Sequence, residues 1–146
     1  AGQSLSAWTA FSTLQQQAAT YDPYLRPTTS RFNAAGTTYS LIQMNYDAAG
    51  RPDCVAQQMN PALFASPSSS VCAHSAEGTF GPDRIVQTTY DVLSRPLSVT
   101  SGIGTPDTLT EQTDYTTNGR PAAVIDGNGN RSTMVYDGFD RMIRME

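Results

Sequence analysis

Apolar and polar residues alternate along several short segments of this chain, which is the pattern of β-strands with one buried face. These segments are rich in Thr, Val, Ile and Tyr, the residues that favour strands. They cover residues 14–21, 38–46, 84–90 and 97–100. Since Gly, Pro, Asn or Asp flanks each of them, the sequence predicts short antiparallel strands joined by turns.

The first residues of the chain carry a less decisive pattern. Apolar side chains recur every three positions between Leu5 and Leu14, which is typical of a short helix. The alternation of Thr and Phe over residues 9–13 also fits a strand. We predict a strand from residue 14 to 21 and leave residues 5–12 open between the two.

Five segments share one motif, in which a Tyr is followed five residues later by an Arg. Four of them have Asp after the Tyr, and four have Pro after the Arg. The segments lie at residues 21–27, 46–52, 90–96, 115–121 and 136–142. Successive tyrosines are 25, 44, 25 and 21 residues apart, so the unit is about 21–25 residues long. We interpret the double-length gap as a repeat that has been replaced by an insertion.

The motif predicts a three-residue β-hairpin loop. In the second copy Asp47 begins a type I turn, Ala48 and Ala49 occupy its centre, and Gly50 takes the left-handed position of the following bulge. The residues expected to shape the turns are Tyr21, Asp22, Arg26, Tyr46, Asp47, Gly50, Arg51, Tyr90, Asp91, Arg95, Tyr115, Gly119, Arg120, Tyr136, Asp137 and Arg141.

Three copies lack glycine at the left-handed position. Leu25, Ser94 and Asp140 stand there instead. Asp tolerates this conformation, whereas Leu and Ser are expected to lose stability or to alter the turn.

Tyr and Arg recur together because they flank each loop on opposite strands. There the guanidinium can stack on the phenol ring or pair with the motif Asp. We interpret the pair as a clip across the neck of its own hairpin. The alternative is that exposed Tyr and Arg side chains form a sugar-binding ladder.

The repeated Y-D-x-x-G-R turn resembles the Rhs/YD-repeat family of bacterial polymorphic toxins, insecticidal toxin-complex subunits and animal teneurins. The similarity runs from Tyr21 to Arg141 and includes the turn at 126–131. The insertion between Arg51 and Arg84 is also similar to a segment of bacterial members. The resemblance implies a long sheet of hairpins that spirals into a hollow shell, which in the bacterial proteins encloses a toxic C-terminal polypeptide. The family's C-terminal core, with its self-cleaving aspartyl-protease site, has no counterpart in these 146 residues.

These observations predict an all-β protein in which consecutive antiparallel β-hairpins form an open, twisted repeat sheet. Residues 1–146 are expected to be one such segment, with an inserted loop at 54–83. A short helical turn is expected in this loop, because Asn60 suits an N-cap and Pro61 suits the first helical position. A hairpin cannot bury its apolar face alone, so the end units keep open edges. We therefore expect neighbouring repeats of a longer chain, or a second copy, to pair with those edges.

Two cysteines and one histidine limit the chemistry. We expect Cys54 and Cys72 to form a disulfide, which closes a 19-residue loop and stabilises the fold by roughly 3 kcal/mol. Such a bond indicates an oxidising compartment. His74 could activate a Cys72 thiolate, which makes a hydrolase one alternative function, although adjacency in sequence is no evidence for such a pair.

No metal or cofactor is expected. The chain has no CxxC and too few Cys and His for a zinc site built from them. Residues 126–130 imitate the opening of a calcium loop, but Arg131 stands where that loop requires Gly. We expect a turn between two hairpins there.

Charge and hydrophobicity exclude further classes of protein. Nine basic residues, all arginine, face 13 acidic ones for a net charge of −4, so no basic face for nucleic acid is expected. No apolar run approaches the ~18 residues of a membrane helix, and no membrane insertion is expected. The chain opens Ala-Gly-Gln-Ser without the features of a signal peptide, and we interpret it as a mature piece or an excised fragment.

No set of residues suggests catalysis, because the motif aspartates belong to turns and the serines lack a base other than His74. With the family resemblance, this predicts a structural segment of a bacterial, exported toxin-type protein that is secreted or displayed at the cell surface. Its expected partner is an enclosed effector polypeptide. The alternative is a module that binds carbohydrate or cell-surface proteins.

Overall fold

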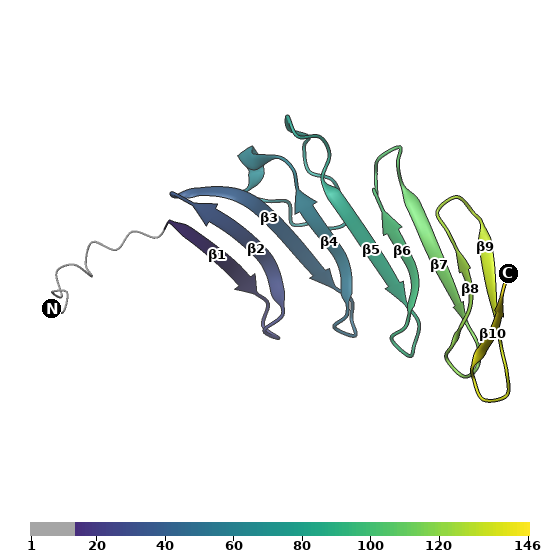
Figure 1. The fold of residues 1–146 in the computed structure, drawn as a ribbon. Coiled ribbons are helices and arrows are strands. Elements are labelled where there is room, and N and C mark those ends of the chain that lie inside the picture. Colours follow the sequence, from purple (N-terminus) through teal and green to yellow (C-terminus); the bar gives the residue numbers. More distant parts are fainter. Residues whose placement is uncertain (1–13) are drawn as a thin grey trace, which may run out of the picture.

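Ten short strands pair in chain order to form one open antiparallel β-sheet (Figure 1). The computed structural model describes residues 14–146, so residues 5–12 lie outside the described part of the chain. The strands are β1 (Gln15–Tyr21), β2 (Pro27–Ala34), β3 (Thr37–Tyr46), β4 (Pro52–Gln58), β5 (Arg84–Tyr90), β6 (Pro96–Ser101), β7 (Leu109–Tyr115), β8 (Pro121–Ile125), β9 (Arg131–Tyr136) and β10 (Met142–Met145). The predicted all-β sheet of consecutive hairpins is confirmed.

The five repeated motifs form the hairpin turns at one end of the strands, which is the lower side of the sheet in Figure 1. In the second turn the Asp47 N–H donates to the Arg51 carbonyl oxygen, and the Gly50 N–H donates to the Asp47 carbonyl oxygen, each at 2.9 Å. Gly50 has a φ of 83°. The loop of three residues with a left-handed third residue is therefore as predicted.

The three non-glycine residues at this position also adopt the left-handed conformation. Their φ angles are 62° for Leu25, 64° for Ser94 and 58° for Asp140. The turn therefore keeps its shape in these copies, and the backbone of Leu25 and Ser94 takes up the strain.

The long loop starts later in the chain than predicted. Cys54 and the following residues as far as Gln58 belong to β4, and the loop spans residues 59–83. β4 pairs directly with β5, so the sheet continues without a gap across this loop. The double-length gap between tyrosines is thus an extended β4–β5 connection at the ends of the strands opposite the turns, and the replacement of a repeat stays a prediction.

The loop contains the expected helical turn, η1 (Pro61–Leu63). The Asn60 side chain accepts a hydrogen bond from the Ala62 N–H at 3.1 Å, as an N-cap does. Among the described residues this turn is the only helical element, and none of them forms a helix with the length and hydrophobicity to cross a bilayer.

The core lies where this loop covers one face of β3, β4 and β5. Leu41, Ala56 and Ile85 are fully buried there, together with Cys54, which is bonded to Cys72 of the loop. The loop residue Phe64 is also buried. A large sheet in which few side chains are buried depends on such a local cover, and the predicted disulfide fastens the cover to the sheet.

Within residues 14–146, no such cover lies on the opposite face of the sheet. Val55 pairs with Val86, which pairs with Ser101, and Ser101 pairs with Leu109. Directly paired residues share a face of the sheet, so the side chains of these four residues lie on one side. Val55 and Val86 are each 38% exposed and Leu109 is 46% exposed. Apolar surface is thus left open to solvent along this face.

Both end strands have an unpaired side within residues 14–146. β1 pairs only with β2, and β10 pairs only with β9. An exposed strand edge is a template for pairing with another chain. We predict that the isolated chain self-associates and that its weight-average mass in sedimentation velocity rises with concentration.

Lysines placed on the end strands provide the control for edge pairing. The double variant Gln16→Lys, Ile143→Lys is expected to shift the protein toward monomer, because charges on an edge strand disfavour edge-to-edge pairing. A wild-type protein that remains monomeric at the highest concentration would contradict the prediction.

Candidate functional site

Each motif aspartate organises its own turn. Asp47 Oδ1 accepts hydrogen bonds from the N–H groups of Ala49 and Arg51, each at 2.9 Å. Its Oδ2 receives Arg51 Nε at 2.7 Å and Nη2 at 2.6 Å. The same bidentate pair joins Asp22 to Arg26, Asp91 to Arg95 and Asp137 to Arg141. The carboxylate therefore fixes the loop backbone and the guanidinium at once.

The guanidinium also stacks on a tyrosine, but this tyrosine belongs to the next hairpin. Arg26 lies 4.4 Å from the centre of the Tyr46 ring, Arg51 lies 4.6 Å from that of Tyr90, and Arg95 lies 4.3 Å from that of Tyr115. The predicted pairing of the Arg with the motif Asp of its own hairpin is confirmed in four copies, whereas the interpretation of a Tyr–Arg clip within one hairpin is wrong. In these three turns the Asp holds its Arg beside the neighbouring hairpin, so the contact joins successive repeats, whereas Arg141 of the last turn lies over Phe139 of its own loop.

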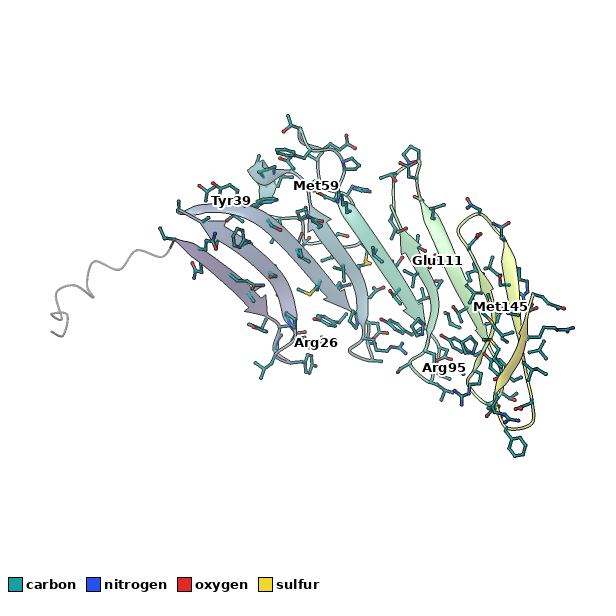
Figure 2. All side chains as sticks on the ribbon, in the orientation of Figure 1. Arg26, Tyr39, Met59, Arg95, Glu111 and Met145 are labelled. Atoms are coloured by element: carbon teal, nitrogen blue, oxygen red, sulfur yellow. A yellow bond between two sulfur atoms is a disulfide. The ribbon has the colours of Figure 1, made fainter. Side chains whose placement is uncertain are left out.

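The tyrosine hydroxyl strengthens the same junction from the other side. It donates to the carbonyl oxygen of the proline that ends the preceding motif. These bonds run from Tyr46 to Pro27 at 2.8 Å, Tyr90 to Pro52 at 2.9 Å, Tyr115 to Pro96 at 2.8 Å and Tyr136 to Pro121 at 2.8 Å. We call this series of Asp, Arg, Tyr and Pro contacts the turn ladder. Figure 2 shows Arg26 and Arg95 at the edge of the sheet that carries it.

The turn ladder brings each arginine close to the backbone of the next loop. Arg51 Nη1 donates to the Asp91 carbonyl oxygen at 2.7 Å, across the junction that the long loop spans. A Cβ atom on Gly50 would lie 3.1 Å from Arg26 Nη1, and one on Gly119 would lie 3.3 Å from Arg95 Nη1. Glycine at these positions therefore serves both the left-handed backbone and the approach of the guanidinium.

The fourth copy departs from the others because Thr116 replaces the aspartate. Thr116 Oγ1 accepts the Arg120 N–H at 3.1 Å, but Arg120 forms no ion pair and no ring stacking within residues 14–146. Asn118 Nδ2 donates to Asp140 Oδ1 at 3.0 Å, which links this turn to the last one. The junction between the fourth and fifth hairpins thus lacks a stacked arginine.

Asp126, which is not part of the five motifs, forms a related turn between β8 and β9 at the opposite ends of the strands. Asp126 Oδ1 accepts the N–H groups of Asn128 and Asn130, each at 2.9 Å, and its Oδ2 accepts Asn130 Nδ2 at 2.7 Å. The segment 126–130 is therefore the predicted turn between two hairpins. Its carboxylate is engaged by the chain itself.

Hydrogen bonds lower the pKa of the motif aspartates. The Arg51 side chain is the largest cause for Asp47, and the Arg141 side chain is the largest for Asp137. For Asp91 the largest cause is the Arg95 backbone N–H. Burial raises the pKa of Asp22, yet the bonds from Arg26 outweigh it and the net pKa is lowered. All four carboxylates are therefore stabilised in their charged form.

The two residues considered for nucleophilic catalysis, Cys72 and His74, form other contacts in the structure. Cys72 is bonded to Cys54, so the thiolate of a Cys72–His74 pair is absent while this disulfide is intact. His74 Nε2 contacts the Ile103 carbonyl oxygen. Asp53 lies beside the two sulfur atoms, but sulfur in a disulfide is not a thiolate ligand for a metal.

Asp83 is a structural residue that the sequence pattern did not reveal. It is 4% exposed and accepts the N–H of Met59 at 2.8 Å, the N–H of Ser75 at 2.9 Å and the Ser75 hydroxyl at 2.5 Å. Burial raises its pKa, but these bonds outweigh that effect and the net pKa is lowered. It therefore ties both ends of the long loop to its middle, and no repeat or spacing marks it in the sequence.

No family model matches this sequence, and no curated protein matches it either. The resemblance to the Rhs/YD-repeat proteins therefore stays a prediction that the five turns and the insertion carry.

The turn ladder predicts unequal effects of two arginine substitutions. Arg51→Ala removes an ion pair, a ring contact and a bond to the next turn, so we expect unfolding free energy to fall by about 1–3 kcal/mol. Arg120→Ala is the matched control and is expected to change it by less than about 0.5 kcal/mol. Urea unfolding followed by circular dichroism measures both, and equal effects of the two substitutions would contradict the assignment.

The lowered pKa values of the motif aspartates predict acid sensitivity. A carboxylate whose pKa is lower in the folded state stabilises that state above its unfolded pKa, and this stabilisation is lost as protons bind. We expect the thermal midpoint to fall as the pH drops below about 4. Asp47→Asn should lower the midpoint at pH 6 and flatten the decline between about pH 4 and 2. A pH-independent midpoint in wild type would disprove the prediction.

Proposed function

We propose that this chain is a structural wall segment of a secreted or surface-displayed toxin-type protein, and that the wall encloses another polypeptide. The observation that carries the proposal is the turn ladder. It joins each hairpin to the next by contacts whose geometry repeats from copy to copy, with the partial exception of the fourth. Such contacts extend a sheet by adding equivalent units, which is the way in which repeat proteins build long surfaces.

The end strands support a place within a longer sheet. β1 and β10 each offer an unpaired edge, and further hairpins with the same motif would continue the ladder at both ends. Tyr21 fits this arrangement, since the residue is 60% exposed and its ring has no stacked arginine within the described residues. An additional hairpin before β1 would supply that arginine.

The face without the loop supports contact with a second polypeptide. Val55, Val86 and Leu109 share this face and are 38–46% exposed, and Phe32 from β2 is 40% exposed. Apolar surface that a sheet leaves open gains stability when another chain covers it. An enclosed effector polypeptide is the partner that we propose for it.

The disulfide supports export from the cytoplasm. The bond between Cys54 and Cys72 fastens the loop to the sheet and requires oxidising conditions to form and persist. Export fits a protein that delivers its contents outside the cell that makes it.

Limited proteolysis of the intact natural polypeptide tests the enclosing role. If the repeat sheet forms a wall, we expect the remainder of the polypeptide to resist a protease that cleaves it rapidly after denaturation. Arg51→Ala combined with Arg95→Ala weakens two neighbouring junctions and should expose the protected part, so that its fragments accumulate faster. Arg120→Ala is the matched control and should leave the protection intact.

Two results would refute the enclosing role. One is an intact polypeptide that contains no chain beyond the repeat sheet. The other is a remainder that is cleaved at the same rate before and after the wall is weakened.

A further inference from the structure

A hollow of about 410 Å³ opens at the ends of the strands opposite the turn ladder. It lies between the start of β3, the end of β4 and the long loop, and Figure 2 shows Tyr39 and Met59 at this side of the sheet. Its volume falls within the range of pockets that hold small molecules, roughly 300–1,000 Å³, so a large aromatic side chain fits in it. The residues that line it include Tyr39, Gln58, Pro61, Phe64 and Phe80.

Two aromatic residues of the hollow are largely open to solvent. Tyr39 is 63% exposed and Phe80 is 65% exposed, whereas Phe64 is 6% exposed. None of the described residues that line the hollow carries a charge. A charged occupant would lose its hydration there without gaining a partner of opposite charge, whereas an apolar one would remove the two rings from water. The hollow therefore favours an uncharged, aromatic occupant.

The residues that precede the described part of the chain have this character. Residues 1–13 read AGQSLSAWTAFST and carry no charged side chain, since the first charged residue of the chain is Asp22. They include Leu5, Trp8 and Phe11, and Trp8 is the only tryptophan of the chain. Tryptophan and phenylalanine bury large apolar areas when they leave water, so these side chains gain much from a partner of matching chemistry.

The point where this segment joins the sheet lies close to the hollow. The Leu14 carbonyl oxygen accepts the Ala35 N–H at 3.3 Å, which places Leu14 beside the turn between β2 and β3. Figure 1 shows the starts of β1 and β3 at the same side of the sheet. Since adjacent strands are about 4.8 Å apart and β2 lies between these two, Leu14 is roughly 10 Å from the start of β3, where the hollow begins.

The segment is long enough to reach the hollow. An extended residue covers about 3.3–3.6 Å, so Phe11 can lie up to about 10 Å from Leu14 and Trp8 up to about 20 Å. The first distance extends to the start of β3, and the second extends past β4 to the long loop. Because the segment is tethered, its docking is intramolecular, and a short tether gives an effective concentration in the millimolar range. A weak contact is therefore sufficient to hold it.

We propose that residues 5–11 dock in this hollow of their own chain, with Trp8 packed against the rings of Tyr39 and Phe80. The docked segment joins the first hairpin to the long loop. β1 gains from this contact, since every residue of the strand except Ala18 is exposed. The inference is independent of the proposed wall function and holds whether or not a polypeptide is enclosed.

Trp8 fluorescence tests the proposal, since no other tryptophan contributes to the signal. In the wild-type chain at low micromolar concentration, we expect emission at shorter wavelength than from a free peptide of residues 1–13, and about threefold weaker quenching by acrylamide. Tyr39→Ala and Phe80→Ala should each shift the docking equilibrium about tenfold toward the undocked segment and return both signals toward those of the peptide. Circular dichroism checks that these variants, changed at exposed positions, keep the sheet.

Phe139→Ala is the matched control, because Phe139 is an 83% exposed residue in the turn between β9 and β10, at the other ends of the strands. It should leave both signals as in wild type. A wild-type Trp8 that behaves as in the free peptide would overturn the proposal. So would protection that survives Tyr39→Ala and Phe80→Ala, which indicates pairing with the free edge of β1, or protection that appears only as concentration rises, which indicates a second copy as the partner.

Discussion

The carboxylate of the motif aspartate is the group on which the regular spacing of the sheet depends. It accepts two backbone N–H groups within its loop and a bidentate guanidinium, and so couples the shape of the turn to the direction of the arginine. That direction places the guanidinium over the next tyrosine. One local interaction thus determines how a hairpin meets its neighbour, and the fourth turn shows the converse, since Thr116 leaves Arg120 without either contact.

The sheet obtains its stability from two different sources along its length. Around β3, β4 and β5 the long loop buries Leu41, Ala56 and Ile85 on one face, and the disulfide holds it there. Beyond this cover few side chains are buried, and the hairpins are joined by backbone pairing and the turn ladder. Polar contacts at the edge of the sheet therefore replace much of the hydrophobic core that a compact domain would use.

Local patterns were sufficient to predict the sheet of consecutive hairpins, the hairpin loops, the helical turn after Asn60 and the pairing of Cys54 with Cys72, but they placed residues 54–58 of β4 in the loop. Each of these is decided by residues close in sequence or, for the cysteines, by the absence of another partner. The stacking of Arg51 on Tyr90 could not be predicted in this way, because it depends on which hairpins are adjacent in space. Asp83 and the hollow beside Gln58 depend on the path of a loop that has no repeat.

The long loop leaves the sheet at the ends of the strands opposite the turn ladder. Backbone pairing between β4 and β5, the stacking of Arg51 on Tyr90 and the bond from the Tyr90 hydroxyl to Pro52 cross this junction, and they retain the geometry found where connections are short. Insertions at that end of the strands can therefore lengthen or diverge without disturbing the turn ladder, as long as the cover over Leu41, Ala56 and Ile85 is kept. In a repeat sheet of this kind, the ends of the strands that carry the turn ladder keep a constant geometry. The loops at the opposite ends can vary, and selection can produce new binding surfaces there.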